Sequence, residues 1–133
     1  MQRSLFTLLA LGASGCAEPV ACTTQALTVA PSPAEDLKAM VFVRSCGPHD
    51  VTVNLSILPR ADELADGPGN TLVLAMNRTQ GTIEFPKASW QDQNHLVVRL
   101  DTTLAVRRSE AEAAGVRIHY LPQTGDPIPG MTP

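Results

Sequence analysis

The sequence predicts an all-β fold, a small antiparallel β-sandwich of about seven short strands that follows an N-terminal signal segment. Its 133 residues give room for one domain. Eleven prolines and nine glycines interrupt the chain, which suits short strands better than long helices. Residues 51–57 alternate strictly, with apolar side chains at the odd positions and Thr52, Asn54 and Ser56 on the opposite face. This alternation predicts a half-buried strand, and no stretch shows a long helical period.

The first fifteen residues have the composition of a secretory signal peptide. Arg3 is the only charged residue before Glu18, residues 5–11 form an apolar run, and residues 12–15 are small. The apolar run is too short to cross a hydrocarbon core about 30 Å thick. We therefore expect residues 1–15 to be a cleaved leader. The alternative is a buried N-terminal helix of the mature fold.

The end of this segment, Ala13-Ser14-Gly15-Cys16, resembles the lipobox of bacterial lipoproteins. The resemblance implies that the Cys16 thiol is acylated and that the chain is cut just before it. The protein would then be attached to the bacterial cell envelope by its lipid and would face the periplasm. Ala13 stands where this family most often has leucine. The alternative is ordinary signal-peptidase cleavage after Gly15 or Ala17, which would leave a soluble periplasmic protein.

The chain has three cysteines, an odd number for an exported protein. If Cys16 carries lipid, Cys22 and Cys46 remain as a pair in an oxidising compartment. A disulfide between them would close a loop of about 25 residues and stabilise the fold by about 3 kcal/mol. The alternative is two unpaired buried thiols. Neither residue belongs to a Cys-x-x-Cys pair, so the spacing does not favour a metal site.

The chain after Cys16 divides into three parts. Residues 16–36 are expected to be a lipid-anchored tether with a first strand-like piece around residues 26–30. Residues 37–121 are expected to form the β-sandwich domain, and residues 122–133 a proline-rich flexible tail. The apolar or alternating patterns within the domain predict strands at residues 39–44, 51–57, 71–76, 82–85, 95–100, 103–107 and 116–121.

Turn residues separate these predicted strands. Cys46-Gly47-Pro48 ends the first, and residues 60–70 form a polar loop that contains two glycines. Pro86 places the strand before it at a sheet edge or a bulge. Ser109 and Glu112 have the spacing of a capping box, which predicts a single helical turn over residues 110–114.

Several short motifs follow one another in a recognisable order along residues 37–121. They are Met-Val-Phe-Val-Arg-Ser-Cys-Gly at 40–47, Val-Asn-Leu-Ser-Ile-Leu at 53–58, Gly69-Asn70, Trp90 before Leu-Val-Val at 96–98, and Gly-Val-Arg-Ile-His-Tyr at 115–120. This order resembles a family of short, uncharacterised exported bacterial β-domains. The resemblance implies an exported β-domain and supplies no catalytic residues.

The sequence favours a binding or structural module over an enzyme. The formal charge of −3 and the lack of a basic stripe argue against nucleic-acid binding. His49, His95 and His119 are isolated in the sequence, and His119 is expected to face solvent on its strand. No Gly-x-Ser-x-Gly elbow, Ser-x-x-Lys pair or phosphate-binding glycine loop occurs. We therefore expect no catalytic residues, no metal and no cofactor.

Asp62, Glu63 and Asp66 lie in one loop that could bind Ca²⁺ weakly, although a solvated acidic loop is the favoured interpretation. The sequence leaves this question open. The expected function is a non-enzymatic structural or protein-interaction module with the membrane and an unknown envelope protein as partners. The alternative is a small inhibitor or immunity-type protein that inserts the loop of residues 60–70 into the active site of an envelope hydrolase.

Overall fold

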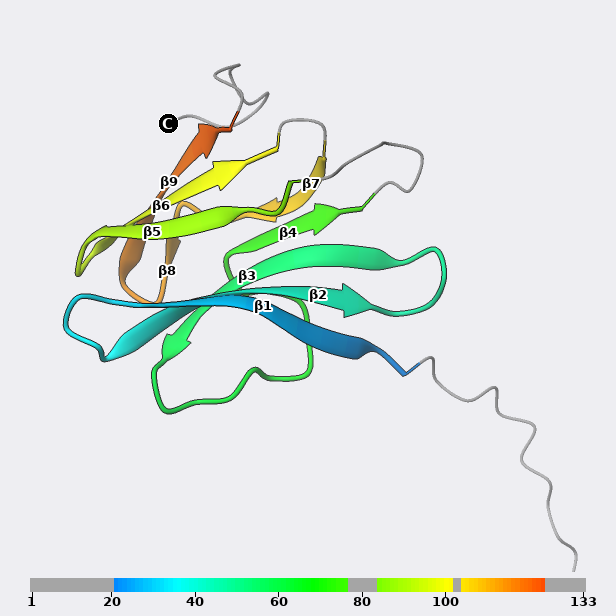
Figure 1. Cartoon of the computed structure of the whole chain (residues 1–133), viewed down its shortest axis with the longest axis horizontal. Helices are drawn as coiled ribbons and strands as arrows, with labels where there is room; N and C mark the ends of the chain where they lie inside the picture. Colours follow the sequence, from blue (N-terminus) through cyan, green and yellow to red (C-terminus); the bar gives the residue numbers. More distant parts are fainter. Residues whose placement is uncertain (1–20, 77–83, 102–103, 124–133) are drawn as a thin grey trace, which may run out of the picture.

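The computed structural model describes residues 21–76, 84–101 and 104–123. These ranges form nine strands in two sheets, with no helix among them, so the predicted all-β fold is confirmed (Figure 1). No helix that could cross a membrane occurs in these ranges. The strands are β1 (Thr23–Pro31), β2 (Leu37–Ser45), β3 (Val51–Pro59), β4 (Leu72–Ala75), β5 (Lys87–Asp92), β6 (His95–Leu100), β7 (Ala105–Ser109), β8 (Glu112–Ala113) and β9 (Val116–Pro122).

The two sheets pack face to face as a sandwich (Figure 1). The five-stranded sheet has the order β1-β2-β3-β4-β7, and the four-stranded sheet has the order β5-β6-β9-β8. Strands β1 to β4 form an antiparallel meander, in which each strand pairs with the next one in the sequence. After β6 the chain crosses to the first sheet to form β7 and then returns, so β9 runs parallel to β6. The other strand pairs of the described residues are antiparallel, as the sequence predicts for the sandwich.

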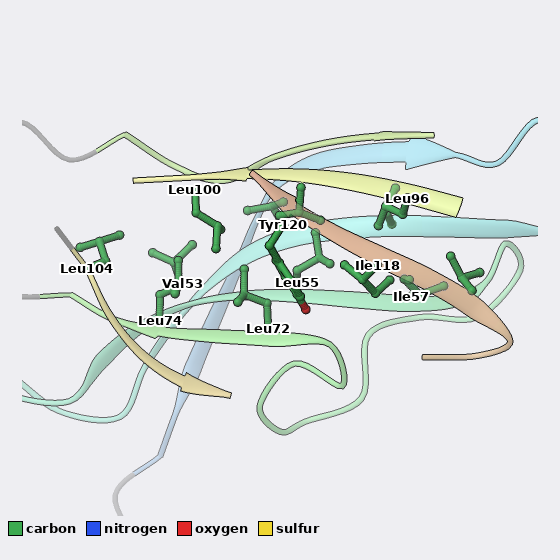
Figure 2. Close-up of a cluster of buried hydrophobic side chains, with 14 residues drawn as sticks. Val53, Leu55, Ile57, Leu72, Leu74, Leu96, Leu100, Leu104, Ile118 and Tyr120 are labelled. Atoms are coloured by element: carbon green, nitrogen blue, oxygen red, sulfur yellow. The ribbon is translucent and has the colours of Figure 1, made fainter. Parts of the chain in front are cut away.

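The hydrophobic core lies between the inner faces of the two sheets, and Figure 2 shows its side chains. The alternation of β3 places Val53, Leu55 and Ile57 in this core, as the sequence predicts. Each fully buried Val, Leu or Ile contributes about 1.5–3 kcal/mol relative to an exposed one. Fully buried apolar residues with no more than 1% exposure include Val41, Val53, Leu55, Ile57, Leu72, Leu74, Leu96, Val98, Leu100 and Val116.

The first strand is longer than expected. β1 pairs with β2 from Thr23 to Pro31, with a bulge near Leu27, although most of its side chains are exposed. The indole Nε1 of Trp90 on β5 donates a hydrogen bond of 2.8 Å to the Ala30 carbonyl, which connects β1 to the second sheet. The strand-like piece expected around residues 26–30 is therefore part of a nine-residue edge strand.

The helical turn expected over residues 110–114 is absent. Instead β8 pairs with β9 through a tight turn at Ala114 and Gly115, whose φ angles are 52° and 76°. Two consecutive positive φ angles are typical of the type I′ turn that joins hairpin strands. The prediction from the spacing of Ser109 and Glu112 is therefore wrong, because the chain forms a hairpin here.

A second correction concerns the chain around Pro86. Positions 82 and 83 of the strand expected at residues 82–85 lie outside the described residues, and residues 84–86 are not in a strand. The strand begins at Lys87 instead and continues to Asp92. The expected signal segment, Cys16 and most of the expected tail also lie outside the described residues.

Candidate functional site

The disulfide of the domain joins the first strand to the second. Cys22 directly precedes β1 and Cys46 directly follows β2, and the pairing of Thr23 with Ser45 places the two cysteines side by side. Their Cα atoms lie 4.2 Å apart and their sulfurs are at bonding distance. The fold therefore brings together the pair that the sequence predicts. We call Cys22 and Cys46 the disulfide corner.

The outer face of β3 is covered by the β3–β4 loop (residues 60–71). Thr52, Asn54 and Ser56 point to this face but are only 7%, 0% and 8% exposed. Figure 1 shows the loop in green on the side of the five-stranded sheet that faces away from the second sheet. The prediction of a half-buried strand is therefore wrong, because β3 is buried on both faces. Asn54 and Ser56 bind the backbone of the loop, and Thr52 forms its hydrogen bonds with the Arg44 carbonyl and the Asn54 side chain.

The hydrogen bonds of these side chains fix the C-terminal end of the β3–β4 loop. Asn54 accepts a hydrogen bond of 2.9 Å from the Gly69 backbone N–H and donates one of 2.9 Å to the Thr52 hydroxyl. Ser56 accepts one of 3.1 Å from the Asn70 backbone N–H. Gly69 lies so close to β3 that a Cβ there would be 2.6 Å from the Leu55 carbonyl oxygen. The loop is thus held against the sheet and does not hang free.

The Asn70 side chain adds a further attachment. Its carboxamide accepts a hydrogen bond of 2.9 Å from the Ile57 N–H and donates one of 2.7 Å to the Ile57 carbonyl. It thereby takes the place that a neighbouring strand would occupy beside β3. Buried backbone groups need such partners, since an unsatisfied one costs about 1–3 kcal/mol.

The three acidic residues of the loop do not gather around one point. Asp62 and Glu63 line a hollow of about 220 Å³ that also contacts Phe42 on β2. Asp66 instead forms an ion pair of 3.6 Å with Arg44. Within residues 21–76, 84–101 and 104–123, no group of three or more His, Cys, Asp or Glu side chains could hold a metal ion.

A second hollow, of about 260 Å³, lies beside the disulfide corner. We call it the arginine pocket because Arg44 from β2 and Arg107 and Arg108 from β7 line it. The remaining residues of its lining are Cys46, Asp50, Thr52, Pro68 and Val73. The sequence did not predict this pocket.

The arginines of the pocket have unequal partners. Arg107 lies 3.1 Å from an Asp50 carboxylate oxygen, and Arg108 donates a hydrogen bond of 3.0 Å to the Gly69 carbonyl. The Nη2 atom of Arg44 makes only the 3.6 Å contact with Asp66, and its Nε is buried without a hydrogen-bond partner among the described residues. Most buried polar atoms have a partner. The Nε of Arg44 lacks such a partner among the described residues, whereas the Arg107 and Arg108 side chains are 52% and 46% exposed and are open to a ligand.

Two histidines that are far apart in the sequence meet on the four-stranded sheet. The rings of His95 on β6 and His119 on β9 stack with centroids 5.6 Å apart and an angle of 21° between their planes. Asp92 lies 2.8 Å from His95 Nδ1, and this hydrogen bond lowers the pKa of the Asp92 carboxyl. The expected solvent-facing His119 is half-buried, and His49 lies apart from the pair on the β2–β3 turn. The parallel pairing of β6 with β9 creates this contact, which no local pattern reveals.

Comparisons with protein-family models, with curated proteins and with solved structures find no match for this chain. The features that bear on function are therefore those of the chain itself: the disulfide corner, the fixed β3–β4 loop, the arginine pocket and the histidine pair. The first three lie together on the five-stranded sheet. Arg44, Cys46 and Pro68 line the same pocket and come from β2, the disulfide corner and the loop.

Proposed function

We propose that this chain is a lipid-anchored module of the bacterial cell envelope that faces the periplasm and binds another envelope protein without catalysing a reaction. The observation that carries the proposal is the disulfide corner. It pairs two of the three cysteines of the chain and leaves Cys16, the residue at the lipobox position. Disulfides persist in oxidising compartments such as the periplasm.

The position of the disulfide suits an anchored domain. Cys22 follows Cys16 by six positions, so the fully extended chain between them spans at most about 20 Å. β1 is an edge strand with mostly exposed side chains, and a force on its N-terminal end would tend to peel it from β2. The bond to Cys46 transmits such a force to the end of β2 and protects the pairing.

The β3–β4 loop supports a role in binding. Asp62, Glu63 and Asp66 are exposed, while Gly69 and Asn70 are fixed to β3 by hydrogen bonds. A loop that is ordered before it binds loses less conformational entropy on association. Acidic side chains on such a loop favour a partner with a basic surface, because complementary charge steers the encounter.

The same loop supports a second candidate function, a small inhibitor of an envelope hydrolase. An ordered acidic loop can enter a basic active-site cleft, and the fixed C-terminal end would hold it in one conformation. An inhibitor would bind a purified hydrolase in a 1:1 complex whether or not the chain is anchored. An anchored interaction module would instead lose its partner when Cys16 is replaced, because the two proteins would no longer meet at the membrane.

Chemical cross-linking in intact bacteria, followed by purification of the tagged protein and mass spectrometry, tests the proposal. We expect the wild type to cross-link to one envelope protein in near-stoichiometric amount, and Cys16→Ser to lose most of that product. The double variant Asp62→Asn/Glu63→Gln should weaken the cross-link, whereas Glu84→Gln/Glu112→Gln, which neutralises two exposed acids outside the loop, should not. Equal cross-linking by wild type and Cys16→Ser would contradict the anchored module.

A further inference from the structure

The arginine pocket lies at the end of the domain that the anchor would hold closest to the membrane. Cys46, one of the residues that line it, is bonded to Cys22. Only six positions separate Cys22 from Cys16, a reach of about 20 Å at most. With an acylated Cys16, the pocket is therefore kept near the layer of lipid headgroups.

The chemistry of the pocket matches a phosphate group. A guanidinium presents several N–H donors in a fixed planar arrangement that fits the oxygens of a phosphate, often through two hydrogen bonds at once. Arg44, Arg107 and Arg108 reach the pocket from two strands, β2 and β7, that are separated by β3 and β4. The side chains of Arg107 and Arg108 are 52% and 46% exposed, so their guanidinium groups can reach a ligand in the pocket.

The acids that pair with these arginines are easily displaced. The side chains of Asp50 and Asp66 are 53% and 87% exposed, and the Arg44–Asp66 contact is 3.6 Å long. Glu110 lies 3.7 Å from Arg108 and is also exposed. Exposed ion pairs contribute little to stability, because each charge is well solvated without its partner. A phosphate with two hydrogen bonds to one guanidinium competes effectively with such a pair.

We propose that the arginine pocket binds the phosphate of an anionic phospholipid headgroup and so docks the anchored domain on the membrane with the disulfide corner toward the bilayer. This proposal rests on the proposed membrane location. Docking would fix the orientation of the domain. The β3–β4 loop borders the pocket at Pro68, so docking would also fix the height at which the loop meets a partner.

Vesicle binding by the full chain carrying Cys16→Ser tests this proposal without the lipid anchor. Any contribution of the leader segment is the same in every variant, so differences between variants report on the pocket. The fraction of protein that sediments with the vesicles is measured for vesicles of phosphatidylcholine alone and for vesicles that also contain phosphatidylglycerol. Each basic residue near an anionic surface contributes about fivefold to the affinity, so Arg107→Gln/Arg108→Gln should weaken binding to the anionic vesicles about 30-fold. Arg99→Gln/Arg117→Gln removes the same charge from the other sheet and is the matched control.

Glycerol 3-phosphate serves as the soluble probe of the same chemistry. Glycerol 3-phosphate should displace the Cys16→Ser chain from anionic vesicles more effectively than sodium chloride of equal ionic strength. With Arg107→Gln/Arg108→Gln added, glycerol 3-phosphate and sodium chloride should displace the chain equally. The proposal is overturned if the pocket variant and the control variant lose affinity equally, or if glycerol 3-phosphate acts only as a salt. Selective binding by the pocket together with an unacylated Cys16 in the wild type would refute the lipid anchor and leave the headgroup site standing.

Discussion

Gly69→Ala tests whether the β3–β4 loop is fixed by close contact with β3. A Cβ at this position would lie 2.6 Å from the Leu55 carbonyl oxygen and 2.8 Å from the Leu72 carbonyl oxygen. Leu55 and Leu72 are paired in the β3–β4 ladder, so neither oxygen can move away without disturbing the sheet. Overpacking of this kind costs about 1–3 kcal/mol. Loss of the buried hydrogen bond from the Gly69 N–H to Asn54 adds at least about 1 kcal/mol.

The free energy of unfolding of Gly69→Ala should therefore fall by at least about 2 kcal/mol. Urea unfolding followed by the fluorescence of Trp90, the single tryptophan, measures this change. Gly67→Ala is the matched control, because a Cβ at Gly67 would meet nothing within 4 Å and its φ is not positive. The control should change stability by less than about 0.5 kcal/mol. Equal stability of the two variants would refute the close contact.

Three further predictions concern the disulfide, the buried tyrosine and the histidine pair. Cys22→Ala/Cys46→Ala should lower the free energy of unfolding in urea by about 3 kcal/mol, and a loss below about 1 kcal/mol would contradict a stabilising bridge. Burial, assisted by the charge of Glu110, raises the pKa of Tyr120 above the ordinary value of 10.0, so this tyrosine stabilises the fold fully below pH 10 and that contribution is lost as the pH rises. Tyr120 is the only tyrosine, so as the pH rises phenolate absorbance should appear only when the circular-dichroism signal of the folded protein is lost. Phenolate absorbance that appears near pH 10 while the protein is still folded would contradict the burial of Tyr120. His95→Ala should raise the pKa of Asp92 toward 3.8 in an NMR titration, and an unchanged value would contradict the hydrogen bond.

The strands that the sequence predicts well are those with one apolar face. Residues 51–57, 95–100 and 116–121 alternate because one side of each strand packs in the core, and alternation is a local signal. The length of β1 cannot be predicted from such a local pattern. Most of its side chains are exposed, and its nine residues are ordered by pairing with β2. The false helical turn at residues 110–114 shows the opposite error, in which a local capping signal gives way to a hairpin.

The candidate site depends on contacts between distant residues, so only part of it could be predicted. The cysteine pair follows from the three cysteines of the chain together with the expectation that Cys16 carries lipid. Arg44 and Arg107 are 63 positions apart, and they share a pocket only because β7 joins the first sheet beside β4. The stack of His95 on His119 likewise requires the parallel pairing of β6 with β9, which a single sequence does not reveal.

The intact mass of the protein purified from bacterial membranes tests the central proposal, the lipid anchor at Cys16, most directly. The proposal predicts a mature chain that begins at Cys16, carries the mass of its acyl chains and lacks the two hydrogens removed by the Cys22–Cys46 disulfide. The Cys16→Ser protein should carry no acyl mass and should keep the same disulfide. A wild-type chain without acyl mass, whether it begins at Cys16, Ala17 or Glu18, would contradict the anchor and identify a secreted protein without lipid.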